Sequence, residues 1–249
     1  MQELQGPEAS TFNEFCGIFG PDEQSEHLSV IKRLCEEVED LQFSYYSFVP
    51  WVGAPDDAVI KTTYAEDWQR LYMEKKYHLI DPVVSDGIWQ CRPFNWSELA
   101  TGGKKVSNFF SEAENFGIGR TGFSVTACCA NNRRGIFSIS SRMKERDWQL
   151  LLRDYSQNII CFALTYHDAI CSQKASEIPT LSNRERQVLY WSAHGKTVWE
   201  IGCILDLSPA TVGFYMRRIC AKLGAVNKSH AVALAIGQRL VDPFEADIH

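Results

Sequence analysis

The period of the apolar positions changes along the chain, and each change marks a predicted element. Apolar residues recur every three or four positions in stretches that predict helices at 26–38, 64–77, 109–116, 147–169 and four times between 181 and 240. Alternating or aromatic-rich stretches predict strands at 43–49, 59–63, 122–128 and 136–141. No parallel strand–helix–strand alternation occurs, so we expect an antiparallel sheet with helices on both faces.

These elements predict an α+β protein with two domains. An N-terminal α-β-α sandwich with an antiparallel sheet is expected over 1–170. A polar segment, 171–180, contains Pro179 and is expected to be a linker. An all-α domain of four helices follows over 181–241, and 242–249 forms a tail.

The helix starts of the C-terminal segment are marked by capping residues. Two pairs have the spacing of a capping box, Ser182 with Glu185 and Thr197 with Glu200. Ser208, followed by Pro209, and Asn227 are expected to cap the third and fourth helices. Gly195 is expected to end the first helix, near His194.

The second and third of these helices are joined by a three-residue turn at 206–208, which predicts a helix-turn-helix. The positions expected to face inward are apolar: Val188, Leu189, Trp191, Ile201, Ile204, Leu205, Val212, Ile219 and Leu223. The other side of the third helix carries Arg217, Arg218 and Lys222, and a helix of this kind fits the major groove of DNA. A helical bundle with ordinary solvated charges is the alternative.

Charge is distributed unevenly between the two expected domains. The 249-residue chain has a net charge of −6, but residues 180–241 contain eight Lys and Arg against three Asp and Glu. The basic segment suits contact with phosphates, and the acidic remainder does not. No apolar run is long enough to span a bilayer and no secretion signal is visible, so we expect a cytoplasmic protein without membrane contact.

Nine cysteines are scattered through the chain and no Cys-x-x-Cys pair occurs. An odd number without metal-ligand spacing argues for reduced cysteines, against a disulfide framework and against a zinc site. We therefore expect no metal and no cofactor.

The C-terminal segment resembles the DNA-binding domain of LuxR-type transcription factors. Four blocks match in order: Leu181-Ser182-Asn183-Arg184-Glu185, the run 195–201 (GKTVWEI), Ser208-Pro209-Ala210-Thr211-Val212 and Lys222-Leu223. The resemblance makes six residues candidates for DNA contacts: Thr197, Ser208, Thr211, Arg217, Arg218 and Lys222. Gly213 and Tyr215 depart from the family pattern, and because glycine has no side chain we expect Arg217 to be the main base-reading residue.

A constellation of aromatic residues precedes Asp81 in the N-terminal domain. Tyr64, Trp68 and Tyr72 are spaced four apart, which predicts one aromatic stripe on a helix. Core packing is the plain interpretation of these rings, and a helix cap is the plain interpretation of Asp81. A carboxylate near so many rings nevertheless requires hydrogen-bond partners.

This segment resembles the N-acyl-homoserine-lactone-binding domain of the same family. The matching residues are Trp68, Tyr72, Asp81, Pro82, Pro93, Trp96, Gly135 and Ser138. The resemblance implies that Trp68 donates to the lactone carbonyl and Asp81 accepts the ligand amide N–H. It implies that Tyr64 and Ser138 donate to the amide carbonyl, and that the head group is surrounded by Tyr72, Trp96, Val83 and Phe109. Candidates for the acyl-chain walls are Phe43, Tyr45, Phe48, Trp51, Phe123 and Ile136.

Together the two resemblances predict a ligand-responsive transcription regulator of quorum sensing. Activators are the commoner members of the family, so we expect an activator. It would bind an N-acyl-homoserine lactone and, as a homodimer, a palindromic site on double-stranded promoter DNA, where RNA polymerase is a further expected partner. An orphan regulator that acts without the lactone is the alternative. A lactone- or amide-processing enzyme is disfavoured, because the sequence contains no nucleophile elbow or metal-ligand cluster.

Overall fold

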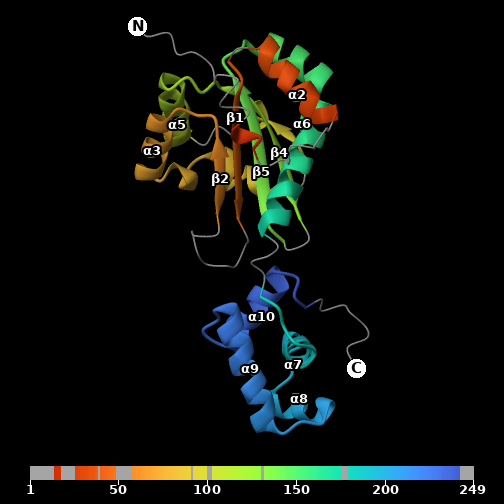
Figure 1. The fold of residues 1–249 in the computed structure, drawn as a ribbon. Coiled ribbons are helices and arrows are strands. Elements are labelled where there is room, and N and C mark those ends of the chain that lie inside the picture. Colours follow the sequence, from red (N-terminus) through yellow and green to blue (C-terminus); the bar gives the residue numbers. More distant parts are fainter. Residues whose placement is uncertain are drawn as a thin grey trace. The chain divides into compact units, whose positions relative to one another are not determined.

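The computed structural model describes residues 14–17, 26–38, 40–48, 58–90, 92–99, 103–129, 132–174 and 179–241. These residues form two compact units, one built on a sheet and ending at Ile170, the other containing the helices that follow Cys171. Figure 1 shows the strands and helices of each unit. No helix among the described residues is long and apolar enough to cross a membrane.

The first unit is built on a five-stranded sheet. Its strands are β1 (Gln42–Phe48), β2 (Val59–Thr62), β3 (Phe94–Asn95), β4 (Thr121–Cys128) and β5 (Arg134–Ser141). They lie in the order β2-β1-β5-β4-β3, and every neighbouring pair is antiparallel. This confirms the antiparallel sheet, and β3 adds a short edge strand to the four that were predicted.

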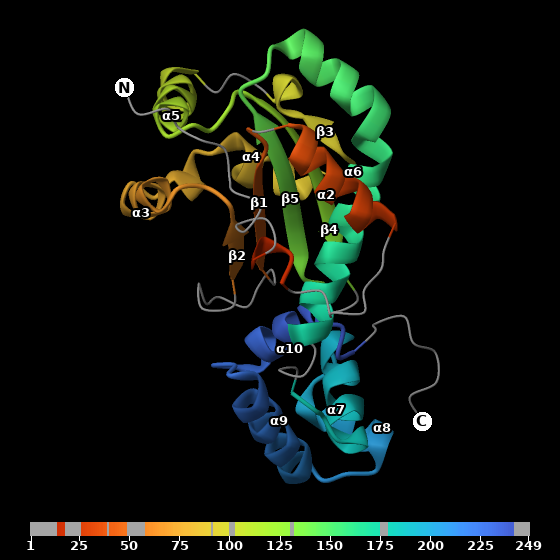
Figure 2. The same cartoon turned by 45° about the horizontal axis from the view of Figure 1, so that its top comes forward.

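Helices cover both faces of the sheet, as predicted. On one face, α2 (Glu26–Glu37) and α6 (Glu145–Lys174) enclose the main core, which includes Phe43, Ile139 and Trp148. The other face is covered by α3 (Glu66–Glu74), α4 (Pro82–Ser85) and α5 (Gly103–Asn115), with the 3-10 helices η2 (Tyr77–Leu79), η3 (Gly87–Trp89) and η4 (Trp96–Glu98). Figure 2 shows α2 and α6 on the side of the sheet away from α3. The two faces therefore have separate apolar clusters.

The second unit contains α7 (Asn183–Ala193), α8 (Val198–Leu205), α9 (Pro209–Leu223) and α10 (Lys228–Gly237). Both capping boxes form: Ser182 Oγ accepts from the Glu185 amide, and Thr197 Oγ1 accepts from the Glu200 amide. Ser208 and Asn227 cap α9 and α10. Capping side chains fix the start of a helix locally. This explains why the starts of these helices could be predicted from the sequence to within about a residue.

Several details differ from the predictions. The helix expected over 109–116 is α5 and starts already at Gly103. Tyr64 lies before α3, because the backbone of Ala65 is extended and the helix starts only at Glu66. Ile204 was expected in the core but is 44% exposed. The long helix α6 continues to Lys174, so the first four residues of the expected linker are helical.

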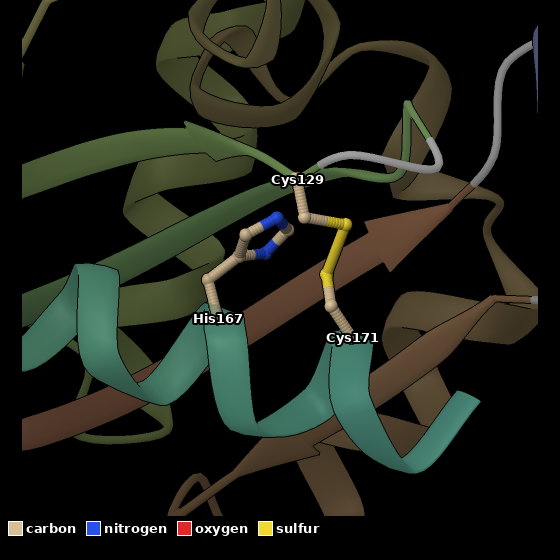
Figure 3. Close-up of side chains that lie close together, drawn as sticks. All are labelled: Cys129, His167 and Cys171. Carbon is tan, nitrogen blue, oxygen red and sulfur yellow. A yellow bond between two sulfur atoms is a disulfide. The ribbon is translucent and has the colours of Figure 1, made fainter. Parts of the chain in front are cut away.

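The expectation of reduced cysteines without a disulfide is wrong for one pair. Cys129 and Cys171 form a disulfide, which is visible as the yellow bond in Figure 3. The two residues are 42 positions apart and come from different elements. Their proximity depends on the tertiary fold, so a search for closely spaced cysteine pairs does not find them.

Candidate ligand and DNA sites

An aromatic cluster forms where α3 packs against α5 and η2. Trp68 is 2% exposed, and its ring centroid lies 5.9 Å from that of Phe109 and 5.7 Å from that of Tyr77. Tyr72 meets the same group, with its ring centroid 6.0 Å from that of Trp68. The structure thus brings together the predicted residues Trp68, Tyr72 and Phe109, and core packing accounts for most of their surface.

Asp81 lies at the edge of this cluster with two hydrogen-bond donors. Its Oδ1 accepts from the Val83 amide at 2.9 Å, which caps α4, and its Oδ2 accepts from the Tyr72 hydroxyl at 3.0 Å. The carboxyl is buried, and this burial raises its pKa to about 6 although the hydrogen bonds from Tyr72, Val83 and Val84 oppose the shift. Among the described residues it forms no ion pair. Asp81 is therefore both a helix cap and an incompletely compensated acceptor.

A row of three serines crosses the middle of the sheet on the α3 side. Ser44 of β1 pairs with Ser138 of β5, and Ser138 pairs with Ser124 of β4. Residues directly opposite one another on neighbouring strands point to the same face. The hydroxyls of Ser124 and Ser138 lie 2.8 Å apart, and the Tyr64 hydroxyl donates to Ser44 Oγ at 3.4 Å. This serine row places Tyr64 and Ser138, both predicted ligand contacts, on one polar strip.

Trp96 is attached to the same row through its indole N–H. Its Nε1 donates to Ser124 Oγ at 2.8 Å, so the ring is held by a hydrogen bond as well as by packing. Gly122 makes room for this ring, because a Cβ at that position would lie only 2.2 Å from it. Val83 and Ile136 pack in the same apolar cluster as Trp96, and Phe110 joins this cluster to that of Trp68. All eight predicted ligand residues therefore border one continuous region.

Sequence reasoning missed Ser44 and Ser124. Both come into phase with Ser138 only through the pairing of the strands, so the alternation within each strand does not reveal them. The same alternation corrects the predicted acyl-chain walls. Phe43, Tyr45 and Phe123 point into the main core on the α6 side, whereas Phe48 and Ile136 lie on the side of the serine row. Trp51 lies outside the described residues.

The three cations predicted to contact DNA differ in their surroundings. Lys222 Nζ lies 2.7 Å from Glu185 Oε2 and 3.0 Å from the Thr180 carbonyl oxygen, and Arg218 Nε lies 3.4 Å from Glu185 Oε1. Arg217 is exposed and forms no ion pair among the described residues. Arg217 is therefore the cation of α9 that is not paired with Glu185, whereas Arg218 is exposed but lies near that carboxylate.

The polar residues predicted to contact DNA lie at helix starts. Thr197 Oγ1 donates to Glu200 Oε2 at 2.8 Å, and the hydroxyls of Ser208 and Thr211 lie 2.8 Å apart. Thr197 and Ser208 are exposed, and Thr211 is half-buried. All three serve the local helix geometry, and their hydroxyls remain near the solvent at the starts of α8 and α9.

Comparison with known proteins finds two family models that match this chain. Residues 24–170 match the autoinducer binding domain, and residues 179–235 match the luxR family of bacterial regulatory proteins. The transcriptional activator protein EchR of Dickeya chrysanthemi is 26% identical over 228 residues, covering 86% of this chain and 90% of that protein. The transcriptional activator protein EsaR of Pantoea stewartii is 28% identical over 204 residues, covering 76% and 82%.

The fold is also shared with a solved structure. Escherichia coli SdiA superposes with a TM-score of 0.65 at 21% identity, covering 94% of this chain and 98% of SdiA. A second SdiA structure, in complex with octanoyl-rac-glycerol, gives a TM-score of 0.64. With an autoinducer-binding domain followed by a helix-turn-helix, this chain belongs to the LuxR family of autoinducer-binding transcription regulators, and not to a family of enzymes.

Proposed function

We propose that the sensor unit binds an N-acyl-homoserine lactone between the aromatic cluster and the serine row. The observation that carries this proposal is the convergence of Asp81, Tyr64 and Ser138 around buried aromatic rings. An acyl amide joined to a lactone offers one N–H donor and two carbonyl acceptors. A buried acceptor and several hydroxyl or indole donors are the complementary set.

The head group is assigned residue by residue. Asp81 accepts a hydrogen bond from the amide N–H, and Trp68 donates one to the lactone carbonyl. Tyr64 and Ser138 both donate to the amide carbonyl. Tyr72 and Trp96 enclose the head group, with Val83 and Phe109 as apolar neighbours.

Ligand binding on this assignment exchanges hydrogen bonds within the site. Ser138 is bonded to Ser124, which in turn accepts from Trp96, and Tyr72 is bonded to Asp81. A serine hydroxyl donates one hydrogen bond and accepts others, so Ser138 can turn its proton to the ligand while still accepting from Ser124. Asp81 Oδ1 and Oδ2 each retain acceptor capacity beside their present donors. Recognition therefore needs little movement of the strands.

The output of this regulator is transcription. We infer that it acts in the cytoplasm as a homodimer on a palindromic site of double-stranded promoter DNA, because two-fold proteins match two-fold sites. Relatives such as EchR are named transcriptional activators, which supports activation. We infer contact with RNA polymerase as its route. DNA contacts are assigned to Arg217 as base reader and to Thr197, Ser208, Thr211, Arg218 and Lys222 near the phosphates.

The central experiment is a thermal shift of the full chain with N-acyl-homoserine lactones of graded acyl length. We expect at least one lactone to raise the melting temperature, because a ligand that binds only the folded state stabilises it. Asp81→Asn should lose this response while the unliganded protein still folds. Asp67→Asn is the matched control, since Asp67 is an exposed residue of α3.

A second candidate function is regulation without a lactone. It is favoured by the hydrogen bonds that the polar groups of the site already make to one another. An acylglycerol, the class of molecule in one SdiA complex, is the matched alternative ligand for the same assay. A shift with octanoylglycerol and with no lactone would replace the lactone assignment, and an absence of any shift would favour the orphan regulator.

A further inference from the structure

A cluster of two cysteines and one histidine lies where α6 passes the end of β4. Cys171 follows His167 by four residues on α6, so both side chains lie on one face of that helix. Cys129 directly follows β4. The two sulfurs and a ring nitrogen of His167 all lie within 4.8 Å of one another. Figure 3 shows the imidazole beside the two sulfur-bearing side chains.

The imidazole of His167 is held from its other side. Its Nδ1 lies 2.8 Å from the hydroxyl of Tyr45, and both side chains are buried. A metal-ligating histidine usually directs its second nitrogen to an oxygen, which fixes the ring and the tautomer. A metal bound through Nε2 would leave this contact between Nδ1 and Tyr45 in place.

Gly135 provides the space for this arrangement. A Cβ at position 135 would lie 2.3 Å from His167 Nδ1 and 2.9 Å from the Tyr45 hydroxyl oxygen. The side chains of His167 and Tyr45 therefore fill the space that a side chain at position 135 would need. The fold accommodates a buried, oriented histidine beside two sulfurs, and the head-group site on the other face of the sheet does not use it.

The backbone spacing of the two cysteines suits two chemical states. Their Cα atoms are 6.6 Å apart, near the upper end of the range in which a disulfide forms. Two thiolates bound to one tetrahedral zinc ion are about 3.8 Å apart, which a rotation of the side chains can reach from this spacing. Thiolate and imidazole ligands select zinc over magnesium or calcium.

We propose that the reduced cluster binds one Zn²⁺ through Cys129 Sγ, Cys171 Sγ and His167 Nε2, and that the disulfide is its oxidised, metal-free form. The oxidant is a low-molecular-weight disulfide such as oxidised glutathione, which takes two electrons from the two thiolates. The Cys129–Cys171 bond forms, the glutathione disulfide breaks, and its two sulfurs take up two protons and leave as thiols. Zn²⁺ is released without a change of oxidation state.

The test uses the full chain, reduced and freed of metal, and titrated with Zn²⁺ against a chromophoric chelator. We expect one Zn²⁺ per chain, and tight binding should be lost in Cys129→Ser, Cys171→Ser and His167→Gln. Tyr45→Phe keeps all three ligands but releases the ring, and should weaken binding about 10- to 100-fold. Cys128→Ser is the matched control, since Cys128 is adjacent and exposed and lies outside the cluster.

Wild-type protein provides a second measurement that needs no variant. Oxidised glutathione should release one Zn²⁺ per chain and remove two titratable thiols together. Failure of the reduced wild-type chain to bind stoichiometric Zn²⁺ would overturn the proposal and leave a plain redox pair. Unchanged binding in both cysteine variants would equally overturn it.

Discussion

Two buried carboxylates, one in each unit, have opposite electrostatic surroundings. Glu185 on α7 is fully buried beside Lys222 and Arg218. Burial alone would raise its pKa, but hydrogen bonds from Lys222 and Ser182 outweigh it and hold the pKa below its usual value. Asp81 has only neutral donors, and burial raises its pKa to about 6. The helical unit therefore compensates its carboxylate within the chain, whereas the sensor unit leaves its carboxylate needing a further donor.

On the proposed function, this difference separates a structural site from a binding site. The desolvation cost of a buried charge with cationic partners is already compensated within the chain, so such a charge does not favour ligand binding. A buried acceptor with weaker partners carries a desolvation cost that a ligand N–H can offset. The variants below test the two carboxylates in turn.

The largest effect is expected from removing the cation beside Glu185. Lys222→Met should destabilise the α7–α10 unit by about 3 kcal/mol, because among the described residues it leaves the buried carboxylate with Arg218, at longer range, as its one cationic partner beside the Ser182 amide. Urea denaturation followed by circular dichroism measures this change. Arg217→Met is the matched control, because Arg217 forms no ion pair among the described residues, and its stability should remain within about 0.5 kcal/mol. Equal stability of the two variants would remove the contrast between the carboxylates.

The next effect is a pH dependence carried by Asp81. Its pKa in the folded state lies above the ordinary value of 3.8, so its contribution to stability is fully present below about pH 4 and is lost as pH rises through 6. The loss should be about 2–3 kcal/mol, from the size of the shift. The difference in unfolding free energy between wild type and Asp81→Asn, measured from pH 4 to pH 7.5, isolates this term from the other carboxylates. A pH-independent difference would contradict it.

Ligand binding should have the opposite pH dependence. An ionised Asp81 is the better acceptor for the amide N–H, so lactone affinity should fall about tenfold for each pH unit below 6. Titrations followed by tryptophan fluorescence at pH 7.5 and pH 5 give this ratio. Equal affinity at both values would show that Asp81 does not accept from the ligand.

A smaller effect concerns the role of Arg217 in DNA binding. Arg217→Ala should weaken binding to a duplex selected from a randomised pool by about tenfold or more, the size of one lost base contact. Binding to a scrambled duplex of the same length should change much less. Fluorescence anisotropy at fixed salt measures both affinities. Equal losses on the two duplexes would mean that Arg217 contacts phosphate instead of a base.

The smallest effect concerns two glycines of the helix-turn-helix. A Cβ at Gly213 would meet only Arg217 Nη1, at 3.7 Å, so Gly213→Ala should stabilise α9 by about 0.5–1 kcal/mol. A Cβ at Gly202 would lie 2.6 Å from the Leu207 carbonyl oxygen, so Gly202→Ala should be destabilising. Thermal melting of the two variants compares them. A melting temperature that falls in both would show that Gly213 has a packing role.

The helical unit was more predictable from the sequence than the sensor site, for a physical reason. Its helix starts depend on side chains three residues apart, such as Ser182 and Glu185, which the sequence shows directly. The exposure of Ile204 and the pairing of Lys222 with Glu185 depend on contacts between helices, which it does not show. Local periodicity could place Trp68 and Asp81, and the family resemblance added Ser138.

The sheet register explains what remained hidden in the sensor unit. Ser44 and Ser124 become neighbours of Ser138 only through pairing of strands that are distant in sequence. Alternation along β1 separates Phe43 from Phe48, but only the strand pairing shows which of them shares a face with Ser138. The proximity of Cys129 to Cys171 depends in addition on the packing of α6. The strands themselves were predictable because each has its own alternation, but their phase relative to one another was not.

The serine row has a consequence for the evolution of ligand preference. Each hydroxyl is both a donor and an acceptor, so turning one proton reverses the polarity of its neighbours while every heavy atom stays in place. A strip of this kind can meet a carbonyl in one ligand and a hydroxyl in another. Substitutions that reshape the apolar walls can therefore change which molecule is sensed without rebuilding the polar centre of the sheet.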